Sequence, residues 1–121
     1  NGTAPELALR QFKDWIVSVI PAGSKPVFVA LNASFDWMFV CDYFIRYLGC
    51  NPFGHSALDI KAFYMGFCGV SWSDTSLKQI SQYVHNEKKL DHNALHDAQD
   101  QALIFKDLLQ KMQERGQTNK R

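Results

Sequence analysis

The sequence predicts an α/β fold in which short parallel strands are flanked by helices. Residues 27–31 form a continuous apolar run rich in β-branched and aromatic side chains, a pattern typical of a parallel strand buried on both faces. Segments with helical periodicity alternate with the strand candidates, which indicates α/β layering. With 121 residues, 46% of them hydrophobic and 21% charged, the chain has the size and composition of one globular domain.

The first helix is expected to begin around Thr3 and to end at Pro21-Ala22-Gly23. Thr3 can cap the helix, Glu6 completes a capping box, and Pro5 is tolerated in the first turn. One apolar face then follows, made of Ala8, Phe12, Trp15, Ile16 and Val19.

The strand at 27–31 leads through Asn32–Asp36 to a second helix, expected from about Trp37 to Leu48 and ended by Gly49. A short second strand is expected at 57–60. A helical segment at 61–67, a loop at 69–75, a helix at 76–84 and a polar loop at 85–91 follow.

The last helix is expected over 94–115, with Gly116 ending it and residues 117–121 forming a disordered tail. Residues 1–116 then make up the domain. The apolar stripe of this helix is expected to consist of Ala98, Ala102, Phe105, Leu109 and Met112.

The predicted sheet is too small to be stable by itself. A strand that is apolar on both faces needs neighbouring strands, yet the chain offers only one other short strand, and a two-stranded sheet is at best marginal. We therefore expect further strands to come from upstream sequence, from a second chain, or from a pairing that the pattern does not reveal.

Charge and composition exclude several classes of protein. The net charge of +1 argues against a protein that coats long duplexes, but it is compatible with an enzyme that grips a few phosphates. No apolar run is long enough to span a bilayer and no signal pattern is present. The odd number of three cysteines, without a close pair, argues against a disulfide scaffold or a zinc–thiolate site. These features favour a cytoplasmic protein.

Two segments carry candidate catalytic residues. In His92–Ala98 a histidine stands five residues before Asp97 at the start of the last helix, a layout for activating water beside a divalent cation. In Asn32–Asp36 the carboxylate of Asp36 follows the end of the buried strand, where open α/β sheets bind their ligands. Asp36 can equally be a helix N-cap, Asp97 a favourable acid in a first turn, and His92 a solvated loop histidine.

Three further features have two interpretations each. Trp72 can stack on a nucleobase if it is exposed, or it can belong to the core. Phe35 fits the core better than a contact surface. His92 and His96 stand four residues apart, but no third ligand of the kind that zinc sites use is evident, so zinc is disfavoured.

The two segments, in this order and with these flanks, resemble the DnaQ-like 3'→5' exonucleases. Within that family the resemblance is to the Asp-Glu-Asp-Asp branch with a catalytic histidine. It covers about Ala4 to Gln113, with 58–60 as the next strand and 76–80 in the helix before the final motif. It implies a ribonuclease H-like fold and action on the 3' end of single-stranded DNA or RNA.

The resemblance also implies two-metal phosphodiester hydrolysis with two Mg²⁺ or Mn²⁺ ions. Asp97 would bind one ion directly, Asp36 would hold the second through water, and His92 would take the proton of the attacking water as general base. Asn32 and Phe35 are candidates for contacts to the substrate.

One part of the family pattern is absent. The family's first motif is Asp-x-Glu on the first strand, and no aspartate of this chain is followed two residues later by glutamate. We therefore expect the chain to be the C-terminal portion of an exonuclease domain that lacks its first three strands, and to bind metal weakly and hydrolyse little alone. The alternatives are an inactive module of this fold that binds nucleic-acid ends or a protein partner, and an α/β fragment whose two aspartates only cap helices.

Overall fold

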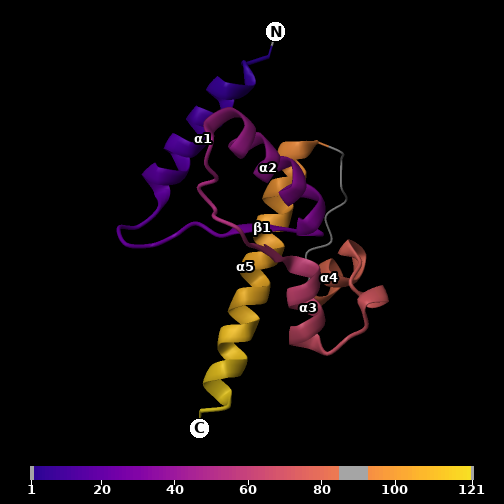
Figure 1. The fold of residues 1–121 in the computed structure, drawn as a ribbon. Coiled ribbons are helices and arrows are strands. Elements are labelled where there is room, and N and C mark those ends of the chain that lie inside the picture. Colours follow the sequence, from indigo (N-terminus) through magenta and orange to yellow (C-terminus); the bar gives the residue numbers. More distant parts are fainter. Residues whose placement is uncertain (1, 85–92, 121) are drawn as a thin grey trace. The chain divides into compact units, whose positions relative to one another are not determined.

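The computed structural model describes residues 2–84 and 93–120. Figure 1 shows the elements along the ribbon: α1 (Pro5–Val19), β1 (Phe28–Ala30), α2 (Ala33–Leu48), β2 (Ala57–Asp59), α3 (Ile60–Cys68), the 3-10 turn η1 (Trp72–Asp74), α4 (Leu77–Tyr83) and α5 (Ala94–Thr118). The strands β1 and β2 form a two-stranded parallel sheet. The predicted α/β class with short parallel strands is confirmed.

The chain divides into two compact units. One comprises Asn1–Val29 with Ala33–Leu58, and the other Ala30–Asn32 with Asp59–Arg121. Within the described ranges, no helix is both long enough and apolar enough to cross a membrane.

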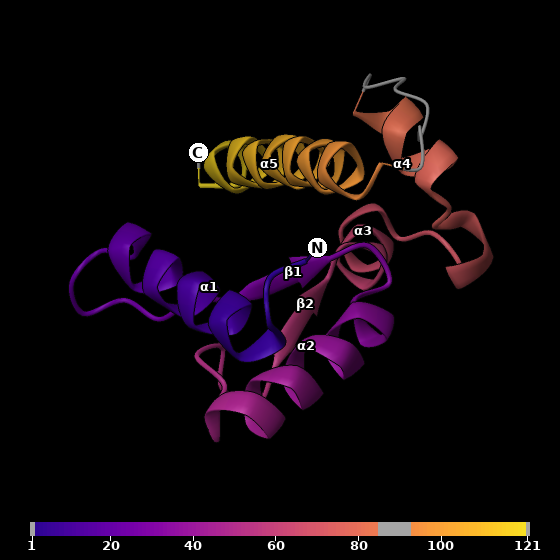
Figure 2. The ribbon, with the colours of Figure 1, turned by 90° about the horizontal axis from the view of Figure 1, so that it is seen from above.

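An aromatic core holds the first unit together. Phe44 of α2 is buried, and its ring centroid lies 5.6 Å from that of Phe12 of α1 and 6.2 Å from that of Phe53. Phe28 of β1 meets Phe53 edge-on at 5.4 Å. Tilted and edge-on rings are the favoured geometries of aromatic pairs, so this cluster fixes α1 and α2 beside the strands (Figure 2).

The second unit is built by α3, α4 and α5. Ile80 of α4 and Leu108 of α5 have no exposed surface. Phe63 of α3 packs edge-on against Phe105 of α5, with 5.9 Å between ring centroids. Burial raises the pKa of Tyr64 on α3, as expected for a phenol removed from water.

The start of α1 differs from the prediction. The N-cap is Ala4, which provides no side-chain hydrogen bond, so the capping box predicted for Thr3 and Glu6 is wrong. Because Pro5 occupies the first helical position, Glu6 stands one residue too early to reach back to the cap. Glu6 instead pairs with Arg10 one turn later, at 2.7 Å.

The burial predicted for the first strand is wrong for most of its length. β1 has only three residues, Val27 is 61% exposed, and only Ala30 is buried. The reason is that β2 is the only strand paired with β1 among the described residues. β2 ends at Asp59, one residue earlier than predicted, and Ile60 begins α3 as a buried residue.

The second helix starts earlier than predicted, at Ala33 rather than Trp37. Asp36 therefore lies inside the first turn of α2, and the alternative that it is the N-cap is wrong. The predicted end before Gly49 is confirmed, with Gly49 at a φ of +69°.

The last helix runs further than predicted and buries a different face. α5 passes through Gly116 to Thr118, so Gly116 does not end it. Its buried residues are Ile104 and Leu108, whereas Ala98, Ala102 and Met112 of the predicted stripe are exposed. Phe105 and Leu109 are half-buried, because they lie one residue, about 100° of helix rotation, from the buried line.

Candidate active site

The segment from Asn32 to Asp36 turns the chain from β1 into α2. Asn32 has a φ of +60° and is the only non-glycine residue with positive φ among the described residues. Asparagine tolerates this left-handed conformation better than most residues. Asp36 is exposed in the first turn of α2. Phe35 is 59% exposed, so the prediction that it belongs to the core is wrong, and its ring is open to a ligand.

The start of α5 is fixed by a side-chain cap. Asn93, in extended backbone conformation, accepts hydrogen bonds at its Oδ1 from the backbone N–H groups of Leu95 at 3.0 Å and His96 at 3.2 Å. The N–H of Asp97 donates to the carbonyl of Asn93 at 2.9 Å. This cap satisfies free N–H groups of the first turn and holds the backbone of Asp97 in place.

One carboxylate oxygen of Asp97 is buried in an unusual way for a charged side chain. The residue is half-buried, and its Oδ1 is shielded from solvent with no hydrogen-bond partner in the described part of the chain. A buried carboxylate oxygen is costly unless a proton, a donor or a cation compensates it. Because Mg²⁺ and Mn²⁺ prefer oxygen ligands, the side chain of Asp97 fits the predicted role of a direct metal ligand.

Gln101 connects this helix start to the sheet within the second unit. Its Oε1 accepts the backbone N–H of Leu31 at 3.0 Å, directly after β1. Gln101 stands one helical turn after Asp97, so both project from the same side of α5. The first turns of α5 therefore lie at the carboxyl end of β1, where α/β folds bind their ligands.

Asp59 is a second carboxylate of the unit that carries Asp97, and the sequence analysis did not single it out. It is the last residue of β2 and caps α3 by accepting the backbone N–H of Lys61 at 3.3 Å. Carboxyl ends of parallel strands meet at one edge, so Asp59 lies on the same edge as Leu31. The sequence did contain a signal for Asp59, because an acidic residue at the end of an apolar strand is typical of ligand sites in α/β folds.

Other predicted residues are not brought together in the structure. His92, the predicted general base, lies outside the described residues, as does the loop at 85–91. Asp36 belongs to the first unit and Asp97 to the second. Among residues 2–84 and 93–120, no three His, Cys, Asp or Glu side chains gather as a metal site.

Comparison with known proteins gives two relatives and no matching family model. The chain is 48% identical over 115 residues to the 3'-5' DNA exonuclease Cap18 of Escherichia coli, matching 95% of this chain and 61% of that protein. It is 30% identical over 118 residues to the PolC-type DNA polymerase III of Staphylococcus haemolyticus, matching 96% of this chain and 8% of the polymerase. The chain thus spans less than two thirds of either relative.

Proposed function

Since this chain is a homologue of the DnaQ-like 3'-5' exonucleases, we propose that it hydrolyses phosphodiester bonds at DNA 3' ends as part of a ribonuclease H-like domain. The observation that carries the proposal is the shielded carboxylate oxygen of Asp97 at the start of α5, which has no hydrogen-bond partner among residues 2–84 and 93–120. The name of the E. coli relative favours DNA over RNA as substrate.

Asp97 is proposed to bind a Mg²⁺ or Mn²⁺ ion directly, and Asp36 to hold a second ion through water. The exposure of Asp36 suits a water-mediated contact, and the shielded oxygen of Asp97 suits a direct one. When bound, such a pair of ions stabilises charge on the attacking and leaving oxygens of the phosphate. His92 is proposed to accept the proton of the attacking water, and the exposed Phe35 and Asn32 to contact the terminal nucleotide.

We further propose that the complete site needs carboxylates and strands that this stretch of chain does not supply. β1 has no partner on its outer edge among the described residues, and an open apolar edge is normally covered. Next to it lies an apolar groove of about 330 Å³, lined in part by Trp15, Val19 and Val27, each more than half exposed. A strand carrying the family's Asp-x-Glu motif would pair with this edge and cover the groove.

The test is a nuclease assay on a 5'-labelled single-stranded oligonucleotide with Mn²⁺. The 121-residue chain is expected to show little turnover, and a longer polypeptide that includes an Asp-x-Glu strand should produce a ladder shortened from the 3' end. Turnover of the 121-residue chain at the rate of the longer polypeptide would contradict the incomplete site. Tight binding of the oligonucleotide without hydrolysis by the longer polypeptide would instead favour the inactive binding module.

A further inference from the structure

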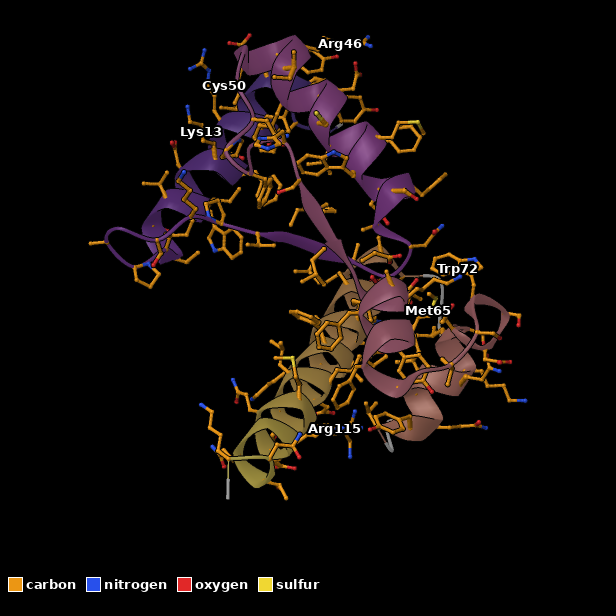
Figure 3. The ribbon with its side chains drawn as sticks, turned by 60° about the horizontal axis from the view of Figure 1, so that its bottom comes forward. Lys13, Arg46, Cys50, Met65, Trp72 and Arg115 are labelled. Carbon is orange, nitrogen blue, oxygen red and sulfur yellow. The ribbon has the colours of Figure 1, made fainter. Side chains whose placement is uncertain are left out.

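The second unit presents an exposed tryptophan paired with a lysine. The Nζ of Lys61, at the start of α3, lies 4.5 Å from the ring centroid of Trp72 in η1. Trp72 is nevertheless 51% exposed, so half of its surface stays open to solvent. Figure 3 shows Trp72 at the turn η1, which packs against α3. An aromatic face beside an ammonium group is the combination that holds a base and its phosphate in single-stranded nucleic acid.

The turn that carries Trp72 is held by hydrogen bonds on both sides. Thr75 is buried, and its Oγ1 donates to the carbonyl of Trp72 at 2.7 Å. The hydroxyl of Ser71 donates to Asp74 at 2.6 Å, and the side-chain amide of Gln79 in α4 reaches the same carboxylate at 3.5 Å. A side chain on a turn fixed in this way loses little conformational entropy when a ligand binds.

The charge of Lys61 is available to a phosphate. Neither of the two ion pairs formed within the described residues involves Lys61. Its contact with the half-exposed indole is weak, so the ammonium can move to an anion at little cost. The carboxylate of Asp74, which shares the turn with Trp72, accepts hydrogen bonds from Ser71 and Gln79.

We propose that Trp72 and Lys61 form a nucleotide subsite, in which the indole stacks on one base of the single-stranded substrate and the ammonium binds an adjacent phosphate. The inference rests on the proposed function, because it assumes that the strand bound by this chain is nucleic acid. It lies in the compact unit that also carries Asp97. The subsite is indifferent to base identity, since every base has a π face.

The test is binding of a fluorescent oligo-dT strand to the full chain in EDTA, together with photocrosslinking of the same strand carrying 5-iodouracil. We expect a crosslink at Trp72 and roughly tenfold weaker binding by Trp72→Ala, with most of the affinity retained by Trp72→Phe. Trp15→Ala is the matched control, because Trp15 is 58% exposed in the first unit and should leave binding unchanged. In Lys61→Ala, the slope of the logarithm of the binding constant against the logarithm of salt concentration should fall by about one, because one phosphate contact is lost.

An abasic strand of the same length separates stacking from charge: it should bind the wild type as weakly as oligo-dT binds Trp72→Ala. Equal binding of oligo-dT by the wild type and Trp72→Ala, with crosslinks elsewhere, would overturn the subsite and leave the proposed function standing. A chain that binds no oligonucleotide at all would overturn the subsite, and the nuclease assay on the longer polypeptide would decide the proposed function separately. If Trp72→Ala instead abolished self-association, Trp72 would belong to a contact between chains, and the subsite would be wrong.

Discussion

The starts of α2 and α5 share one sequence pattern and differ in structure. Each reads Asn-Ala-x-x-Asp, with alanine as the first helical residue and the aspartate in the first turn. At α5 the asparagine is extended and caps the helix through its side chain. At α2 it is left-handed, because it must turn the chain within two residues of the end of β1.

The two aspartates differ in the same way. Asp36 is exposed to water, whereas Asp97 keeps one carboxylate oxygen buried and unpartnered within the described residues. Water can solvate the exposed carboxylate, whereas the shielded Asp97 oxygen would gain from a donor or a cation, and the described residues provide no donor to it. The same pattern thus yields an acid suited to water-mediated contacts and an acid suited to direct binding of a cation.

The largest expected effect is on catalysis. In a polypeptide with the complete site, Asp97→Asn should lower kcat by at least about 100-fold, because a direct ligand of the ion is lost, and Asp36→Asn by roughly tenfold. Steady-state hydrolysis of a labelled strand measures both. Asp97→Asn should be as stable as the wild type in EDTA, or more so, since it replaces a carboxylate whose Oδ1 is shielded from solvent without a donor in the described part of the chain. Equal losses in the two variants would remove the distinction between the two acids.

The second-largest expected effect is on stability, and it concerns the hydrogen bond between Gln101 and the residue that follows β1. Gln101→Leu should lower the free energy of unfolding by about 1–3 kcal/mol, because the part-buried N–H of Leu31 loses its acceptor. Gln110→Leu on the same helix is the control. Gln110 is exposed, and its side-chain amide donates to Glu114 one turn away, so a change within about 0.5 kcal/mol is expected. Urea unfolding of both variants measures the difference, and equal values would show that the bond to β1 contributes nothing.

The smallest effects separate the two asparagines. Asn93→Ala should lower the free energy of unfolding by about 1 kcal/mol, because two N–H groups of α5 lose their cap. Asn93→Asp should retain most of this stability, since aspartate can cap in the same way. Asn32→Ala should lower the free energy of unfolding by about 1 kcal/mol for a different reason, because alanine is strained at the positive φ of this position. Asn32→Gly should leave the free energy of unfolding almost unchanged, because glycine adopts positive φ readily. Urea unfolding measures all four. A cost of Asn32→Gly as large as that of Asn32→Ala would show that the side chain, not the backbone, matters there.

Local patterns in the sequence predicted most of the fold, and long-range partners account for the errors. The element order, the end of α2 at Gly49 and the second strand depend on nearby residues, and they are confirmed. The burial of 27–31 and the stripe of α5 depend on what packs against them, which periodicity does not specify. Val27 is exposed because β1 has no second neighbouring strand in the described part of the chain. α5 buries Ile104 instead of Ala102 because Gln101 turns toward β1.

In the candidate site, too, some features follow from local sequence and others depend on tertiary packing. The place of Asp97 in the first turn of α5 follows from capping rules, and the place of Asp36 just after β1 follows from the strand end, so the sequence was sufficient for both. The earlier start of α2, which puts Asp36 inside the helix, was not predicted. The shielding of the Asp97 oxygen and the exposure of Phe35 depend on tertiary packing, so only the structure reveals them.

The central claim is that Asp97 binds a divalent cation, and paramagnetic broadening by Mn²⁺ tests it most directly. In a titration of the full chain followed by amide NMR, the signals of Leu95, His96 and Asp97 should broaden first, and in Asp97→Asn they should stay sharp at the same Mn²⁺ concentration. Broadening at these amides that is unchanged in Asp97→Asn, or that first appears at other acids such as the exposed Asp42, would contradict the account.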